Sequence, residues 1–74
     1  MLIAHGFVSD GRCFVACNGD DITRDFACNS FRAGGKTFYV KAFQVCNSFS
    51  NHLQVMMEIY GTELPPIGEG IILD

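Results

Sequence analysis

Residues 2–17, which read LIAHGFVSDGRCFVAC, decide the fold that the sequence predicts. Two runs of alternating apolar residues, Leu2–Val8 and Cys13–Cys17, lie on either side of the dipeptide Asp10-Gly11. An Asp-Gly pair between two such runs is typical of a two-residue β-hairpin, because both central positions of its turn need a positive φ. We therefore expect two antiparallel strands joined by a tight turn at the start of the chain.

Two further strands are expected in the middle of the chain. Asn18-Gly19 predicts a second turn, and the alternation over Ile22–Cys28 predicts a third, half-exposed strand. The Gly-containing segment Asn29–Gly35 is expected to be a loop. Lys36–Val45 is rich in Phe, Tyr and Val, which predicts a long fourth strand. Its apolar residues change parity at Ala42 or Phe43, which indicates a bulge.

The sequence after residue 47 predicts a helix, because apolar residues recur there at spacings of three and four. These residues are Phe49, Leu53, Met56, Met57 and Tyr60. Helix caps are available at Ser48, Ser50 and Asn51, and stop signals at Gly61 and Pro65-Pro66. The run Ile71-Ile72-Leu73 predicts a short closing strand or a tail that packs across the helix.

Together these elements predict one small α+β domain over residues 1–74. Its two layers are an antiparallel meander of four or five strands and one helix, in the order β-β-β-β-α-(β). A single helix covers only part of such a sheet, and the chain holds seven Phe residues. We therefore expect a homodimer that covers the remaining apolar surface, by sheet packing or by edge pairing.

Composition excludes several classes of protein. Apolar residues make up 49% of the chain and charged residues 18%, which is typical of a sequence that folds. The apolar runs are too short to cross a membrane, and no basic segment precedes Met1–Ala4, so we expect no secretory signal and a cytoplasmic location. The net charge of −3 counts against nucleic acid as a partner.

The charges are unevenly placed along the chain. Residues 1–41 hold all five Lys and Arg and four acidic residues, which sum to +1, whereas residues 42–74 hold four acidic residues and no Lys or Arg, which sum to −4. Two surfaces of opposite sign would favour pairing with charged partners. A solvated acidic face is the simpler interpretation of the same distribution.

The four cysteines, Cys13, Cys17, Cys28 and Cys46, are the most unusual part of the composition. We interpret them as free thiols that act as small apolar side chains in strands. Disulfides are one alternative, and zinc binding by Cys28 and Cys46 together with His5 and His52 is another. No spacing typical of a zinc site supports the second, so we predict no metal and no cofactor.

Cys46 is the best candidate for a reactive thiol. It directly precedes the predicted helix, whose N-terminal dipole could lower the thiol pKa, and His52 follows about one turn into that helix. A buried strand cysteine and a surface histidine explain the same two residues without chemistry. We therefore predict no catalytic residue.

These observations predict a non-catalytic protein-binding or regulatory module. Its interaction face is expected on the apolar and acidic side of the helix, at Met56, Met57, Tyr60, Glu58 and Glu63. The size of the chain would suit an accessory protein of a phage or a mobile element. The alternatives are a small-molecule or metal-binding protein with a dimer cleft lined by aromatic and cysteine side chains, and a thiol-dependent enzyme that uses Cys46.

Overall fold

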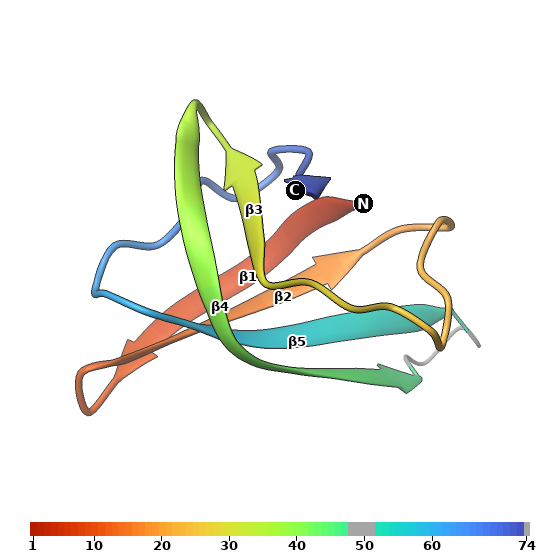
Figure 1. Cartoon of the computed structure of the whole chain (residues 1–74), viewed down its shortest axis with the longest axis horizontal. Helices are drawn as coiled ribbons and strands as arrows, with labels where there is room; N and C mark the ends of the chain where they lie inside the picture. The colour runs from red at the N-terminus through yellow and green to blue at the C-terminus, as the bar shows by residue number, and fades with distance from the viewer. Residues whose placement is uncertain (48–51, 74) are drawn as a thin grey trace.

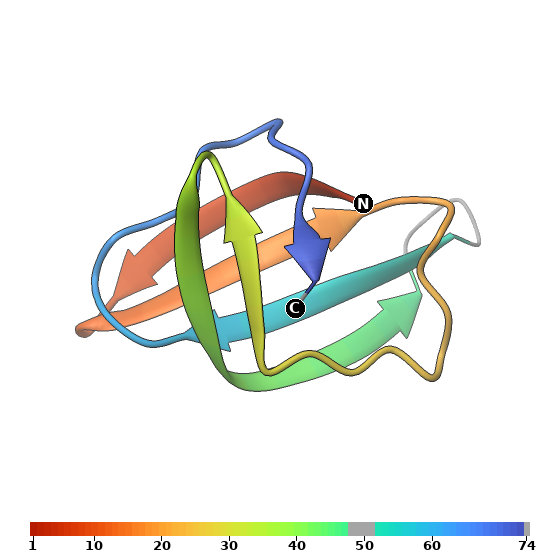
Figure 2. The same cartoon turned by 45° about the horizontal axis from the view of Figure 1, so that its top comes forward.

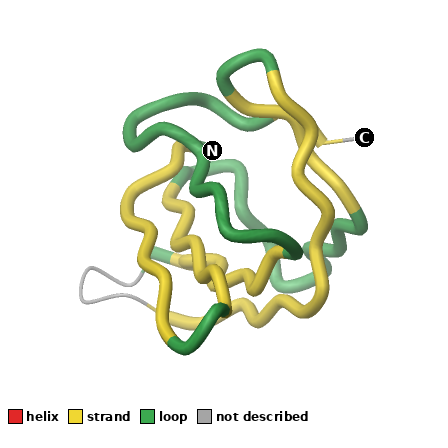
Figure 3. Tube along the Cα trace, turned by 90° about the vertical axis from the view of Figure 1, so that its left-hand side faces the viewer, coloured by secondary structure: helices red, strands yellow, loops and turns green. Residues whose placement is uncertain are grey.

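A computed structural model describes residues 1–47 and 52–73 of the chain. In these residues every regular element is a β-strand, as Figures 1 and 3 show. The strands are β1 (Leu2–Ser9), β2 (Arg12–Asn18), β3 (Ser30–Ala33), β4 (Lys36–Asn47), β5 (Leu53–Ile59) and β6 (Ile72–Leu73). The predicted α+β class with one helix is therefore wrong, and the structure is an antiparallel all-β sheet.

The six strands form one sheet in the order β1-β2-β5-β4-β3-β6. The long strand β4 connects its two parts: residues 36–39 pair with β3, whereas residues 40–47 pair with β5. Figure 1 shows β4 bending between these two directions. The register of β4 against β5 shifts between Val40 and Ala42, which confirms the predicted bulge at this place in the strand.

The C-terminal segment joins the two outer strands of the sheet. The Ile3 N–H donates to the Glu69 carbonyl at 2.9 Å, and the Gly68 N–H donates to the Ile3 carbonyl at 2.7 Å. The Ile71 N–H donates to the Met1 carbonyl, and the chain then continues into β6, which pairs with β3 (Figure 2). The sheet therefore closes on itself, and its inner face becomes the core.

Alternate residues of the two central strands fill this core. From β2 and β5 they are Cys13, Val15, Cys17, Val55, Met57 and Ile59, each no more than 2% exposed. Phe31 of β3 and Phe38 of β4 add a stacked pair, with ring centroids 5.4 Å apart. A strand places successive side chains on opposite faces, so the intervening residues of β2 and β5 lie on the outside.

The hairpin predicted at residues 2–17 is confirmed. β1 and β2 are antiparallel, and Ser9 lies opposite Arg12 on either side of the turn. Asp10 and Gly11 have φ values of 52° and 74°, which are the positive values that this turn requires. Local sequence thus determines this part of the sheet, together with its register.

The predicted third strand is wrong. Residues 19–29 connect β2 to β3 and form no strand, although the Asn29 carbonyl accepts from the Val40 N–H of β4 at 2.9 Å. β3 forms at Ser30–Ala33, within the segment predicted as a loop. Ile22 and Cys28 are buried because this connection packs against the core, while the Phe26 ring meets the Phe43 ring edge-on at 5.6 Å. The alternation of buried and exposed residues in this segment therefore results from packing against the core and not from pairing with a neighbouring strand.

The predicted helix is also wrong where the structure describes it. Residues 53–59 form β5, which lies between β2 and β4 and pairs with both. Because β2 and β4 form hydrogen bonds to both sides of its backbone, this segment is more stable as a strand than as an isolated helix. The predicted caps Ser48, Ser50 and Asn51, together with Phe49, lie outside the described residues.

Of the two structures predicted for Ile71-Ile72-Leu73, a closing strand and a tail across the helix, the first is observed. Ile72–Leu73 forms the closing strand β6, and there is no helix in residues 1–47 and 52–73 for a tail to cross. Over the same residues, the structure holds no helix with the length and apolar character needed to span a membrane.

Candidate functional site

The outer surface of β1, β2 and β5 carries a cluster of side chains that the core does not use. Phe7 and Phe14 lie opposite each other in the β1–β2 register, and their rings stack with centroids 5.1 Å apart. The His5 ring lies 6.1 Å from that of Phe7. Met56 of β5 is half-buried on the same outer side. We call His5, Phe7, Phe14 and Met56 the aromatic face.

A shallow hollow lies beside Phe14 on this face. Its volume is about 210 Å³, and Ala42, Gln44 and Met56 are among the residues that line it. Phe7, at the other end of the stack, is 42% exposed. The aromatic face therefore combines an exposed ring, Phe7, with a hollow that the Met56 side chain helps to line.

Arg12 and Glu58 border the aromatic face. The Arg12 Nε and Nη2 donate to the two carboxylate oxygens of Glu58, at 3.0 and 2.8 Å. The guanidinium carbon also lies 5.1 Å from the centroid of the Phe14 ring, which allows a cation–π interaction. The hydrogen bonds from Arg12 lower the pKa of Glu58, and the same contact raises the pKa of Arg12.

The charge that this border presents to solvent is positive. The side chains of Arg12 and Lys41 are 58% and 54% exposed, whereas that of Glu58 is only 11% exposed. The Lys41 Nζ lies 3.8 Å from the Glu58 Oε2, the oxygen that also accepts from the Arg12 Nε. A partner would therefore meet two cations here, although the whole chain carries a net charge of −3.

The fold does not keep the two oppositely charged halves of the sequence apart. Arg12 and Lys41 from the first half pair with Glu58 from the second, and Lys36 pairs with Glu63. Two of the acidic residues expected on a separate acidic face are thus neutralised within the chain. These ion pairs do not support two surfaces of opposite sign, the alternative to a solvated acidic face.

The predicted interaction face is divided by β5. Met57 is only 1% exposed and belongs to the core, whereas Met56 and Glu58 lie on the outer side of the strand. Tyr60 is 62% exposed just beyond β5. Glu63 lies in the loop after β5, where it forms an ion pair with Lys36 of β4. The structure therefore brings Met56 and Glu58 to the aromatic face and places the other three elsewhere.

Phe7, Phe14 and Arg12 were not among the predicted site residues, and His5 was named only as a ligand in the zinc alternative. A signal for them was present in the hairpin. A two-residue turn at positions 10 and 11 sets residue 7 opposite residue 14, so the sequence already implied a cross-strand Phe pair.

The cysteines are free, and Cys13, Cys17 and Cys28 are buried, as expected for small apolar side chains. Burial raises the pKa of Cys17 to about 11. The Cys28 Sγ donates to the Ser30 carbonyl at 3.1 Å. Among residues 1–47 and 52–73, no three His, Cys, Asp or Glu side chains form a group that could hold a metal ion.

Cys46 and His52 contact different residues. Cys46 is half-buried on β4, and its Sγ lies 3.6 Å from the Gln54 carbonyl. His52 is exposed, with its Nδ1 3.7 Å from the carboxylate of Asp20. Because residues 53–59 are a strand, the helix dipole that was expected to activate Cys46 is not present. The predicted reactive thiol at Cys46 therefore has no helix in residues 53–59 to activate it.

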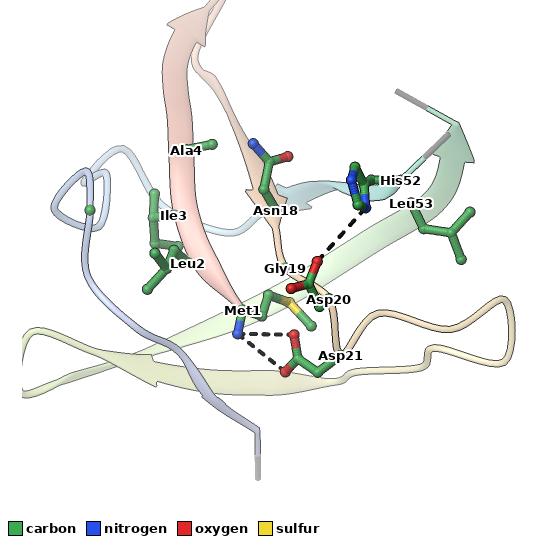
Figure 4. Close-up of a pocket in the computed structure, with 11 residues that line it drawn as sticks. Met1, Leu2, Ile3, Ala4, Asn18, Gly19, Asp20, Asp21, His52 and Leu53 are labelled. Atoms are coloured by element: carbon green, nitrogen blue, oxygen red, sulfur yellow. Dashed lines mark hydrogen bonds and ion pairs between the residues drawn. The ribbon is translucent and has the colours of Figure 1, made fainter. Parts of the chain in front are cut away.

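A larger pocket lies beside the start of β1 (Figure 4). It measures about 670 Å³, and its lining includes Leu2, Asn18, Asp20, His52 and Leu53. At its edge the Met1 ammonium group lies 3.1 Å from the Asp21 carboxylate and lowers the pKa of Asp21. The lining contains neither a cysteine nor a Phe or Tyr ring, so this is not the aromatic and cysteine-lined cleft of the sequence-based alternative.

The aromatic face and this pocket are the two candidate sites on the surface formed by the described residues. One presents exposed rings and cations on an open sheet, and the other presents an acid–imidazole pair above apolar walls. No family model, curated protein or solved structure matches this chain.

Proposed function

We propose that this chain is a non-catalytic protein-binding module whose binding surface is the aromatic face. The observation that supports this proposal is the stacked pair Phe7 and Phe14, which lies outside the core and leaves Phe7 42% exposed. Aromatic side chains and arginine are enriched where protein interfaces gain most of their binding energy. Methionine, here Met56, adapts its shape to different apolar partners.

The exposed charges indicate the chemistry of the partner. Arg12 is held over Phe14 by Glu58 and still exposes most of its side chain, as does Lys41. Charges of opposite sign across an interface increase both specificity and association rate. The partner is accordingly an extended protein segment in which an aromatic or aliphatic side chain enters the hollow beside Phe14, with an Asp or Glu next to it.

Selection from a library of random peptides displayed on phage tests this proposal. The wild-type chain should enrich peptides that combine an apolar residue with a neighbouring Asp or Glu. Phe14→Ser should weaken their binding at least about tenfold, the loss expected for a central aromatic contact. Arg12→Gln should also weaken binding and make it less sensitive to salt.

Tyr39→Ser is the matched control, because Tyr39 is 61% exposed on the part of β4 that pairs with β3. It should bind the selected peptides as the wild type does, and circular dichroism should show that all variants are folded. The proposal is wrong if no peptide is enriched, or if the folded Phe14→Ser variant binds the same peptides undiminished.

The pocket beside Met1 favours a second candidate function, the binding of a small molecule. Its volume of about 670 Å³ lies within the range of ligand sites, and its lining mixes apolar walls with Asn18, Asp20 and His52. A ligand raises the melting temperature of the form that binds it. A panel of small metabolites should therefore contain a compound that raises the Tm of the wild type but not of Asn18→Ala; otherwise this candidate is rejected.

A further inference from the structure

Most of β1 has a strand neighbour on one side only. Its first residues bond to the C-terminal segment, through Met1 and Ile3. From Ala4 to Ser9 the backbone bonds in the described structure are those to β2. This stretch is therefore a free sheet edge with unpaired backbone donors and acceptors.

The hairpin register identifies the free groups on this edge. Ser9 and Arg12 lie on either side of a two-residue turn, so they exchange both of their backbone hydrogen bonds. This pairing alternates along an antiparallel ladder, and Phe7 opposite Phe14 is the next pair of the same kind. Gly6 and Val8 lie between these positions, so their N–H and C=O groups point away from β2.

The edge lacks the usual protection against association. Natural edge strands carry charged residues, proline or a bulge that prevents pairing with another chain. The segment Leu2–Ser9 contains no Lys, Arg, Asp, Glu or Pro, and its bulge lies between Ile3 and His5, outside the free groups. Phe7 and Val8 are 42% and 47% exposed on this edge.

We infer that a second copy of this chain pairs with this edge, antiparallel and about a two-fold axis, with Gly6 opposite the partner's Val8. In this register Val8 also lies opposite the partner's Gly6. The unpaired N–H and C=O groups of Gly6 and Val8 on each copy therefore all bond to the other copy. Four backbone hydrogen bonds result. Phe7 lies opposite the partner's Phe7 at the axis, in the kind of pair that brings side chains closest.

The edge itself places no charge against a second copy. Two copies with a net charge of −3 each repel one another at long range, but the segment Leu2–Ser9 has no Lys, Arg, Asp or Glu, so edge pairing brings no like charges into direct contact. The pairing also joins the two aromatic faces into one row that runs from Phe14 through the two Phe7 rings to the partner's Phe14. The inference thus goes beyond the proposed function, since it gives the module two adjacent binding surfaces.

Charge substitutions at Phe7 test both the dimer and its register. Sedimentation equilibrium should show a dimer of the wild type in the micromolar range, as expected for a small interface. Phe7→Lys and Phe7→Glu should each be monomeric, because like charges would lie opposite each other. An equal mixture of the two variants should form dimers again. Tyr39→Lys, an exposed ring elsewhere, should remain dimeric.

Disulfide trapping provides a second measurement that does not depend on these charged variants. In a Cys46→Ser background, His5→Cys mixed with Ser9→Cys should cross-link under mild oxidation, because the register sets residue 5 opposite the partner's residue 9. Ser9→Cys alone should not. A monomeric wild type overturns the inference, as does a charge variant that still forms dimers, or a mixture that does not.

These outcomes are independent of the test of the proposed function. A monomeric chain that binds peptides through Phe14 would reject the dimer and support the binding module. A dimer with the expected cross-link that binds no peptide would do the reverse.

Discussion

Arg12 and Glu58 connect the two central strands β2 and β5 through a pair of hydrogen bonds, although 46 residues separate them in the sequence. Glu58 lies directly opposite Phe14 in the register of these strands. Arg12, two residues before Phe14 on the same face, reaches it diagonally across the ladder. The contact therefore fixes the position of a cation at the edge of the aromatic face and favours one register of β5.

This contact predicts how stability depends on pH. The pKa of Glu58 is lower in the folded chain than in the unfolded one, so its stabilising contribution is complete above the unfolded value of about 4.3 and is lost as the pH falls through the folded value. Urea unfolding of the wild type should show a free energy of unfolding that decreases from pH 6 to pH 3.

Glu58→Gln should decrease the free energy of unfolding at neutral pH and reduce its dependence on pH in this interval. Part of the dependence should remain, because the Met1 ammonium group also lowers the pKa of Asp21. Equal pH dependence of the wild type and Glu58→Gln would show that the contact with Arg12 does not stabilise the fold.

The turn between β1 and β2 predicts the effect of a side chain at Gly11. Gly11 has a φ of 74°, and a Cβ added there would meet no atom within 4 Å. Gly11→Ala should therefore lower the free energy of unfolding by about 1 kcal/mol through backbone conformation alone. A chain made by chemical synthesis with D-alanine at position 11 should be at least as stable as the wild type, since D-residues favour positive φ. If both alanine forms lost the same stability, the conformational explanation would be wrong.

The burial of the cysteines predicts the order in which they react. With iodoacetamide at pH 8, Cys46 should be alkylated first in the folded protein, because it is the one cysteine that is not fully buried. Cys17 should be protected by burial and by its pKa of about 11. Mass spectrometry of the native and the urea-unfolded chain measures both rates, and Cys46→Ser should remove the fast reaction. Rapid alkylation of Cys17 in the folded chain would contradict the structure.

The parts of the fold that the sequence predicts correctly are those set by local chemistry. Asp10-Gly11 determines a turn whatever the rest of the chain does, and the parity change near Ala42 marks the place where β4 bends. The connection at residues 19–29 is different. Ile22 and Cys28 are buried by distant strands, and a short window of sequence does not distinguish such packing from a strand.

The predicted helix over residues 53–59 was wrong because of an apolar residue on the outer face of β5. Leu53, Val55, Met57 and Ile59 alternate as a strand should, but Met56 adds an apolar residue on the outer face. With Met56 included, the spacing also matches a helix. Met56, which we assign to the aromatic face, thus made the segment resemble a helix. For this reason the sequence did not predict β5 or the residues that it contributes to the candidate site.

The closure of the sheet by residues 68–71 also determines when the protein can fold during synthesis. The β1–β2 hairpin can form as soon as residue 18 has left the ribosome. Its other contacts form later, because β2 pairs with β5 and Met1 bonds to Ile71, 70 residues further along the chain. Contacts between such distant residues slow folding, because the intervening chain must be ordered before they form. We expect a nascent hairpin that remains incomplete until residue 71 has left the ribosome, followed by slow closure of the sheet.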